Sequence, residues 1–213
     1  MKTALIAGST GLIGKQLLEL LLDDPHYSEV KAISRKPIAI SNPKFKNIVM
    51  DSDGLKENID QLKADDVFCC LGTTIRKAGS KEAFRKIDYE YPLELATITK
   101  DQGATQYLLV TALGSDKKSG VFYNQVKGQV EEAIDGVNFQ SYHIFRPSLL
   151  MGPRAESRSG EEAAKVFFRF FGFLVPRMYK GIESIKVARA MLHFAKQNLK
   201  GKFIHESKEL QQY

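Results

Sequence analysis

The sequence predicts an α/β fold: a doubly wound parallel sheet with helices on both faces. Two observations support this prediction. Short apolar runs rich in β-branched or aromatic residues alternate along the chain with amphipathic runs of helical length, and a glycine-rich turn joins the first strand to the first helix. With 213 residues, of which 43% are hydrophobic and 26% charged, the chain can bury a sizeable core. We therefore expect residues 1–213 to form one Rossmann-type domain.

The glycine turn is the most informative local feature. Thr3–Ala7 has the composition of a buried strand, and Leu12–Asp23 has the apolar spacing of an amphipathic helix. Gly8, Gly11 and Gly14 lie at the turn between them. Glycine lets the backbone approach a pyrophosphate closely, and the start of the helix supplies unpaired N–H groups and partial positive charge. A glycine triplet alone marks only a turn, but strand, turn and helix in this order predict a dinucleotide site.

The rest of the chain continues the alternation of strands and helices. Further strands are predicted at Val30–Ser34, Asn47–Met50, Asp66–Leu71, Tyr107–Thr111 and Phe139–Phe145. The predicted helices between them are Leu55–Leu62, Lys81–Gln102 and Val121–Ile134. The alternation becomes irregular near Gly152-Pro153, where a polar run over 154–162 begins. We expect a small substrate-covering segment there, at about 152–182, rather than an independent domain.

Several classes of protein are excluded by the composition. No apolar stretch reaches about 18 residues, and the chain enters its first strand without a basic and apolar leader. We therefore predict no membrane span and no secretion signal, and expect a cytosolic protein. Cys69 and Cys70 are adjacent at the end of an apolar run, which favours buried thiols over a disulfide. The four histidines are scattered without ligand spacing, so no metal site is predicted.

The charge balance permits nucleic-acid binding without favouring it. The net charge is +6, from 31 basic and 25 acidic residues. The basic residues are spread along the chain, and aromatic residues are not interleaved with them as in a stacking platform. Anionic small molecules or a solvated surface rich in lysine account for the charge equally well. Nucleic acid is therefore an unexpected partner.

The end of the second strand bears on the choice of cofactor. In a Rossmann-type unit an acidic residue about 20 positions past the glycines accepts hydrogen bonds from the adenosine ribose and selects NAD. This chain has Ser34, Arg35 and Lys36 at that place. A guanidinium can bind a 2′-phosphate at two oxygens, so NADP(H) is predicted in preference to NAD(H). The alternative is that Arg35 and Lys36 are merely exposed residues at a strand end.

A tyrosine and a lysine supply the candidate catalytic pair. Tyr123 and Lys127 are four residues apart on one predicted helix and so share a face. Tyr27 and Lys31 have the same spacing, but Tyr123 follows the strand that ends at Thr111. In an open α/β sheet chemistry gathers at the carboxyl ends of the strands, so we expect the later pair to be the functional one.

The chemistry of this pair suits proton transfer. A phenol titrates near 10, so its ionised form needs stabilisation at neutral pH, and Lys127 can supply the positive potential. Lysine has three donors, enough to hold the nicotinamide ribose as well. Thr111 can hydrogen-bond a substrate oxygen, with Ser115 as the competing candidate because Ala112 has no hydroxyl. The alternative is an ordinary surface tyrosine and lysine on an amphipathic helix.

Together these features resemble the short-chain dehydrogenase/reductase superfamily, in its atypical branch without Asn-Asn-Ala-Gly after the fourth strand. More closely, the chain resembles the Tat-interacting-protein oxidoreductase-like family. The resemblance covers nearly the whole chain, and the run CCLGTT is a specific marker. The stretches that carry it are Cys69–Thr74 with Lys77-Ala78-Gly79, Tyr123–Gly128, Phe145-Arg146-Pro147, and Glu156-Ser157-Arg158 with Gly160-Glu161.

This resemblance implies a role for each candidate site residue. Arg35 and Lys36, next to Ser34, would meet the 2′-phosphate, and Asp51 would approach the adenine. Tyr123 and Lys127 would form the active pair. The residues implied around the phosphates are Ser9, Thr10, Gly11 and Leu12, and those implied beneath the nicotinamide side are Leu71, Gly72 and Thr73. The same turn makes Gly8, Ile13 and Gly14 further cofactor-binding candidates. Glycine at the strand end suits this independently, because it lets the backbone pass close to a ligand. Relatives tend to carry two serines at Thr111-Ala112, so Thr111 and Ser115 both stay open as the third residue.

One aromatic segment is separate from this site. Val166–Val175 contains five phenylalanines, with Lys165 and Arg177 beside it and Arg169 within it. Core packing, or a lid over the substrate pocket, is the favoured interpretation. Docking on an anionic membrane surface or a protein partner is the alternative. The phenylalanines are Phe167, Phe168, Phe170, Phe171 and Phe173.

Two functions of different class fit the sequence. The leading hypothesis is an NADPH-dependent reductase of a small carbonyl compound, with hydride from the nicotinamide and a proton from Tyr123. The second is a non-catalytic NADP(H)-binding sensor or scaffold whose partners read the nucleotide state, because the family includes members of that kind. The substrate and the oligomeric state are left open.

Overall fold

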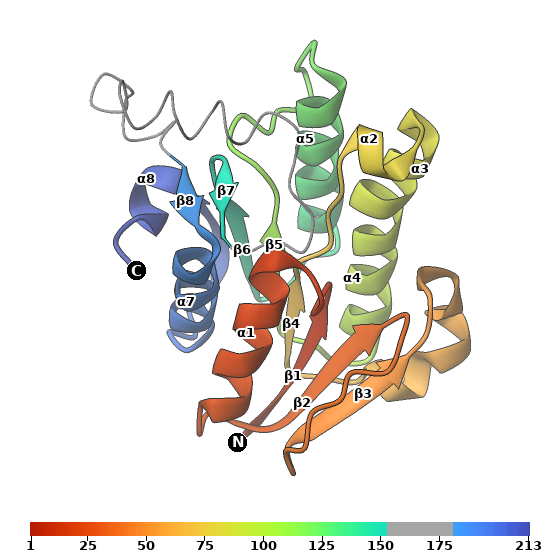
Figure 1. The fold of residues 1–213 in the computed structure, drawn as a ribbon, viewed down its shortest axis with the longest axis vertical. Coiled ribbons are helices and arrows are strands. Elements are labelled where there is room, and N and C mark those ends of the chain that lie inside the picture. The colour runs from red at the N-terminus through yellow and green to blue at the C-terminus, as the bar shows by residue number, and fades with distance from the viewer. Residues whose placement is uncertain (153–180) are drawn as a thin grey trace.

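The computed structural model describes residues 1–152 and 181–213, which form a sheet with helices on both faces (Figure 1). Among these residues seven strands form the central sheet, in the order β3-β2-β1-β4-β5-β6-β9, and every neighbouring pair is parallel. The strands are β1 Lys2–Ala7, β2 Tyr27–Ser34, β3 Phe45–Val49, β4 Asp66–Cys69, β5 Gln106–Val110, β6 Ser141–Arg146 and β9 Gly201–Glu206. This sheet confirms the predicted doubly wound α/β fold.

Helices cross over between these strands. The α-helices are α1 Leu12–Asp23, α2 Ile75–Ala78, α3 Lys81–Arg85, α4 Tyr91–Asp101, α5 Phe122–Asp135, α7 Ser184–Ala195 and α8 Ser207–Leu210. Two short 3₁₀ helices, η1 Ser52–Gly54 and η2 Lys56–Leu62, follow β3, and a π-helical turn, η3 Lys86–Glu90, joins α3 to α4. A second, two-stranded parallel sheet pairs β7 Leu150–Met151 with β8 Ile182–Glu183.

The strand order has a switch point between β1 and β4. From β1 the chain moves outward through β2 to β3, and from β4 it moves the other way through β5 to β6. In such sheets ligands bind outside the carboxyl ends of the strands at the switch point. The glycine turn follows β1 and the segment Cys70–Thr73 follows β4, so both lie at this place.

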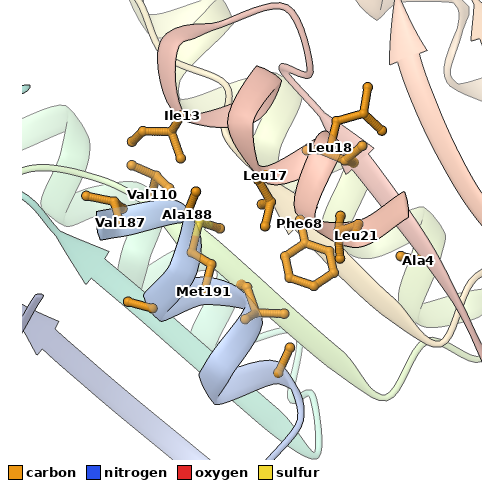
Figure 2. Close-up of a cluster of buried hydrophobic side chains, with 14 of the residues drawn as sticks. Ala4, Ile13, Leu17, Leu18, Leu21, Phe68, Val110, Val187, Ala188 and Met191 are labelled. Carbon is orange, nitrogen blue, oxygen red and sulfur yellow. The ribbon is translucent and has the colours of Figure 1, made fainter. Parts of the chain in front are cut away.

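Two apolar layers hold the helices to the sheet. Ala4 and Ile6 of β1 lie in the layer under α1 and α7, whereas Leu5 and Ala7 face the other layer, under α4 and α5. All four residues are at most 2% exposed. Alternate side chains of one strand are therefore buried on both faces, as in parallel sheets generally. Figure 2 shows the first layer, whose labelled members include Leu17, Leu21, Phe68, Val110, Ala188 and Met191.

Most predicted elements are present, with three differences. The predicted helix Lys81–Gln102 is interrupted by the π-helical turn, and the helix predicted at Leu55–Leu62 is a kinked 3₁₀ helix. The elements that were not predicted are η1, α2, α7, α8, β7, β8 and β9. Strand β9 lies at the sheet edge, where a strand needs few apolar side chains, so its sequence GKFIHE lacks the apolar run of an inner strand. Most of the segment expected at about 152–182 lies outside the described residues.

A chain of largely buried polar contacts joins β5, β6, β9 and α8. Ser141 Oγ donates to Gln106 Oε1 at 3.0 Å and also contacts His143 Nε2 at 3.0 Å. His143 Nδ1 lies 3.0 Å from His205 Nε2, and His205 Nδ1 lies 3.2 Å from a carboxylate oxygen of Glu209. The one proton of Ser141 goes to Gln106, so His143 must donate at Nε2 and, when neutral, accept at Nδ1. Burial and then the neighbouring His205 lower the pKa of His143 to about 4.

This neutral histidine predicts a pH dependence of stability. Between its unfolded value of 6.5 and about 4, the unfolded chain binds a proton that folded His143 does not. The free energy of unfolding should therefore fall as the pH is lowered through this window, by up to about 1.4 kcal/mol per pH unit. Urea unfolding at a series of pH values should show a shallower dependence for His143→Gln than for the wild type. Equal slopes in the two proteins would contradict this assignment.

Candidate functional site

The glycine turn is shaped by close backbone contacts. Gly8 has φ +80°, and a Cβ there would lie 2.6 Å from the carbonyl carbon and oxygen of Cys70. A Cβ on Gly14 would lie 2.1 Å from the carbonyl oxygen of Gly8. Cys70 N also donates to Ala7 O at 2.9 Å. Any side chain at Gly8 or Gly14 would therefore push β4 or α1 away from the turn.

The start of α1 is suited to an anion. Gly11 precedes the helix and has no side chain with which to cap it, and the first turn holds no acidic residue. Ser9 is buried, and its hydroxyl donates to Ile33 O at 3.3 Å, which ties the turn to β2. Thr10 is exposed, and Leu12 is partly exposed at the first position of the helix. Backbone amides and the helix dipole thus favour negative charge here, and these residues fit the phosphates of a dinucleotide.

The residues predicted at the adenosine end lie after β2 and β3. Arg35 and Lys36 are exposed, and neither forms an ion pair within the described part of the chain. Ser34 is buried, and its hydroxyl donates to Lys36 O at 2.7 Å and accepts from Asn47 Nδ2 at 2.8 Å. Asp51 accepts from Gly54 N at 3.1 Å and caps η1. Ser34 therefore shapes the turn, while the two cations at its tip are open to solvent.

The predicted pair lies on α5. Lys127 is 3% exposed, and its ammonium forms an ion pair of 2.7 Å with Oδ1 of Asp88. Tyr123, one turn earlier, is partly exposed, and its ring packs against Phe84 with centroids 5.4 Å apart. Phe84 and Asp88 are themselves four residues apart, on α3 and η3. Tyr123 and Lys127 on α5 therefore face Phe84 and Asp88, respectively, on α3 and η3.

The segment after β4 connects the two halves of the site. At one end, Cys70 and the amide of Leu71 lie against Gly8. At the other, a Cβ on Gly72 would lie 3.5 Å from both Lys127 Nζ and Asp88 Oδ1. Two extended residues span about 7 Å at most. The structure therefore brings the glycine turn and Lys127 to the same place at the switch point, as the sequence predicts.

The charge of Lys127 depends on its neighbours. Burial disfavours an ammonium, but Asp88 and then Tyr123 outweigh it and raise the pKa of Lys127 above its ordinary value. Lys127 is therefore charged at neutral pH. Asp88 was missed in the sequence, although a signal was present: it falls with Phe84 and Leu95 on the buried side of the predicted helix, where a carboxylate needs a partner.

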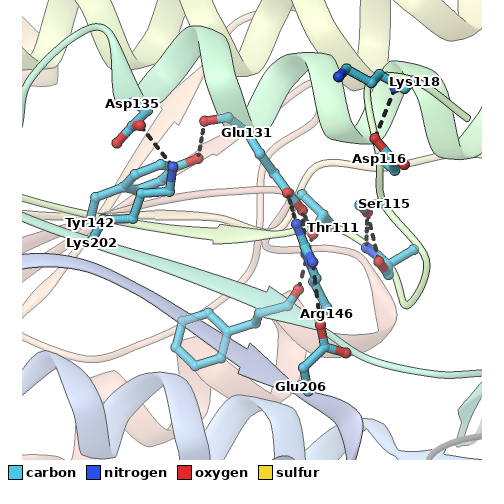
Figure 3. A network of polar contacts seen from close by, with 12 residues as sticks. Thr111, Ser115, Asp116, Lys118, Glu131, Asp135, Tyr142, Arg146, Lys202 and Glu206 are labelled. Atoms are coloured by element: carbon cyan, nitrogen blue, oxygen red, sulfur yellow. Dashed lines mark hydrogen bonds and ion pairs between the residues drawn. The ribbon is translucent and has the colours of Figure 1, made fainter.

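The two candidate third residues have internal partners. Thr111 is 5% exposed, and its hydroxyl donates to Glu131 Oε1 at 2.6 Å. Glu131 in turn forms an ion pair with Arg146, which also contacts Glu206 at 3.3 Å (Figure 3). Ser115 Oγ donates to Ala112 O at 2.6 Å. The single proton of each hydroxyl is thus used within the protein, and the structure does not bring either one to Tyr123 as a free donor.

Two sequence features cannot be placed. The phenylalanine-rich segment Val166–Val175 and the stretch 156–161 lie outside the described residues. Within 1–152 and 181–213, the structure has no helix that is both long and apolar enough to cross a membrane. The same residues contain no group of three or more histidine, cysteine or acidic side chains that could hold a metal ion.

Known proteins resemble this chain over most of its length. A match to the NAD dependent epimerase/dehydratase family covers residues 4–172. Protein HTATIP2 of Rattus norvegicus is 36% identical over 198 residues, which are 90% of this chain and 80% of that protein. Protein fmp52, mitochondrial, of Aspergillus clavatus is 32% identical over 190 residues, which are 86% of this chain and 80% of that protein. The resemblance inferred from the sequence motifs is thereby confirmed.

Solved structures share the fold. An oxidoreductase of the short chain dehydrogenase/reductase family from Burkholderia thailandensis matches with a TM-score of 0.73 at 16% identity, over 100% of this chain and 93% of that one. The Bordetella bronchiseptica enzyme WbmH, in complex with NAD+, matches with a TM-score of 0.72 at 16% identity, over 97% of this chain and 76% of that one. At such identities the likeness shows a Rossmann-like fold and nothing finer.

The cytosolic location expected from the sequence is contradicted. Several relatives are named as mitochondrial proteins, among them fmp52 of Aspergillus clavatus and FMP52 of Lodderomyces elongisporus. The expectation rested on the lack of an apolar leader. A leader of that kind directs secretion, so its presence or absence does not separate cytosolic from mitochondrial proteins.

The close contacts of the turn predict a large effect of one methyl group. Gly14→Ala should lower the free energy of unfolding by about 2 kcal/mol or more, because its Cβ overlaps the carbonyl oxygen of Gly8. Urea unfolding measures the loss. Gly120→Ala is the matched control, since a Cβ there meets no described atom within 4 Å. Similar losses in the two variants would show that the crowding at Gly14 is not what matters.

Proposed function

This chain belongs to the NAD dependent epimerase/dehydratase family, and from that premise we propose that it is an NADP(H)-dependent oxidoreductase that reduces a small carbonyl compound. One observation carries the proposal. The segment Cys70–Gly72 contacts the glycine turn at one end and Lys127 at the other, so one bound dinucleotide can reach both. The glycine turn and the start of α1 would hold its phosphates. When bound, the reduced nicotinamide supplies a hydride.

The chain's own residues would manage the proton. Tyr123 is the partly exposed member of the pair and would donate a proton to the carbonyl oxygen, so that hydride and proton together give an alcohol. Lys127 would stabilise the phenolate left behind, through its charge, and would direct its remaining donors to the nicotinamide ribose. Gly72 suits this arrangement because a side chain there would cover the ammonium of Lys127.

Thr111 would act indirectly. Its hydroxyl joins the end of β5 to Glu131, which lies one helical turn after Lys127 on α5. We therefore assign Thr111 to the positioning of α5 rather than to contact with the substrate oxygen. Ser115, the competing candidate, keeps its loop closed through Ala112.

The choice of NADP(H) over NAD(H) rests on Arg35 and Lys36. Both are exposed at the carboxyl end of β2, beside the glycine turn that Ser9 ties to Ile33. Two cations with no carboxylate partner among the described residues suit a 2′-phosphate. The family is described as NAD dependent, so the preference for NADP(H) rests on these two cations alone.

A second function is favoured by one observation. Both candidate substrate-binding hydroxyls are used within the protein, and Lys127 is matched by a buried carboxylate. Such a site suits a protein that binds NADP(H) without catalysis and whose affinity for a partner protein depends on the nucleotide it has bound. The two functions share the nucleotide site and differ only in the chemistry at Tyr123.

Substitution of the pair separates the two functions. Tyr123→Phe should lower NADPH-dependent reduction of aldehydes and ketones by about 10²-fold or more, while NADPH binding, measured by fluorescence, stays within about twofold. Lys127→Met should lower both the rate of carbonyl reduction and the affinity for NADPH. If the wild-type protein binds NADPH but reduces none of a broad carbonyl panel, the reductase proposal fails. A nucleotide-dependent change in partner affinity would then support the sensor.

The cofactor assignment has its own test. Arg35→Ala should lower the preference for NADPH over NADH by about tenfold or more, because a charge-assisted hydrogen bond contributes about 1.5–3 kcal/mol. The dissociation constants of both nucleotides measure the preference. Arg189→Ala removes an exposed arginine on α7 and serves as the control. An unchanged ratio in Arg35→Ala would rule out a contact with the 2′-phosphate.

A further inference from the structure

The carboxylate of Asp88 binds two parts of the candidate site at once. Oδ1 lies 2.7 Å from Lys127 Nζ, and Oδ2 accepts a hydrogen bond of 2.9 Å from Thr73 N. Asp88 is 1% exposed. One buried side chain thus fixes an ammonium on α5 relative to the backbone of the segment after β4.

We propose that Asp88 is a positioning residue that keeps Lys127 charged and aims its ammonium at the nucleotide side of Gly72. The first half of this proposal concerns the protein alone. The second half rests on the proposed function, because it assigns Lys127 to a bound dinucleotide.

The local backbone supports this role. Asp88 is the middle residue of the π-helical turn Lys86–Glu90 between α3 and α4. A π-helical turn inserts one extra residue into a helix, and such turns occur frequently at functional sites. Here the turn places a charged side chain on the buried side of a helix that otherwise buries Phe84, Pro92 and Leu95 there.

The energetics also separate this pair from ordinary core packing. Removing two charges from water costs free energy that their attraction often fails to recover, and well-packed apolar residues can replace a buried ion pair at little or no loss. The stability of the core therefore does not explain why Asp88 and Lys127 are charged residues. A ligand that requires an ammonium at this place does explain it, because a buried lysine without a carboxylate partner loses its proton.

The remaining neighbours of Lys127 cannot replace Asp88. Within residues 1–152 and 181–213, the ionisable groups with the largest effects on its ammonium are Asp88 on η3, Tyr123 on α5 and Cys69 on β4. Burial raises the pKa of the Cys69 thiol, which is therefore neutral at physiological pH. Without the carboxylate, burial dominates and the pKa of Lys127 falls.

The test reads Lys127 directly. In protein labelled with ¹⁵N-lysine, the Nζ resonance of Lys127, assigned by its loss in Lys127→Met, should titrate above the ordinary lysine value. In Asp88→Asn, which keeps an acceptor for Thr73 N but removes the charge, the titration midpoint should fall by about one pH unit or more. In Asp88→Glu, which keeps the negative charge, the midpoint should lie close to that of the wild type. Asp53→Asn removes an exposed ion pair to Lys86 of the same π-helical turn and should change nothing.

The outcomes separate this inference from the proposed function. A Lys127 midpoint unchanged in Asp88→Asn overturns the role of Asp88. If that variant does not fold, the wild type decides, because a midpoint at or below the ordinary lysine value overturns it equally. NADPH affinity should fall with rising pH at the lowered midpoint in Asp88→Asn. If Lys127→Met binds NADPH as the wild type does, the nucleotide contact of Lys127 fails, while the titration result for Asp88 stands.

Discussion

The site depends on the contact between the glycine turn and the backbone that leaves β4. Gly8 carries no side chain, so the carbonyl of Cys70 can pass directly over it. This contact keeps the segment Cys70–Thr73 close to the turn and directs it toward α5. Two residues later the same segment covers the ion pair of Lys127 and Asp88. A methyl group at Gly8 would therefore disturb both ends of the candidate site.

Two groups of ion pairs with buried carboxylates lie at opposite ends of the strands. At the amino ends of the strands, Asp66 accepts from Tyr27 at 2.8 Å and pairs with Lys2 at 2.9 Å. This cluster faces away from the switch point and joins β1, β2 and β4. At the carboxyl ends, Glu131 with Arg146 and Asp88 with Lys127 hold α5 from two directions. The first group serves the sheet, whereas the second sets the orientation of the helix that carries Tyr123.

Much of this fold could be predicted from short-range patterns. Helix α1 has the predicted bounds because Gly11 and the leucine spacing are local signals. The π-helical turn has no such signal, since its middle residue Asp88 pairs with Lys127 on α5, which is distant in the sequence. Likewise the hydroxyl of Thr111 was predicted to face a substrate, but its partner Glu131 lies twenty residues away and is recruited by folding. Asp88 was missed although its place on the buried side of the predicted helix was a local signal, because its partner Lys127 lies on a different helix.

The pairing of β7 with β8 has an evolutionary consequence. In the two-stranded sheet Leu150 pairs with Ile182, and Met151 pairs with Glu183. The two ends of the intervening stretch are therefore held side by side. The entropy of closing a loop between fixed ends grows only slowly with its length. Relatives can therefore lengthen, shorten or exchange the intervening stretch without moving the strands on either side. Insertions and deletions between relatives are therefore expected to collect between Met151 and Ile182 rather than within the seven-stranded sheet.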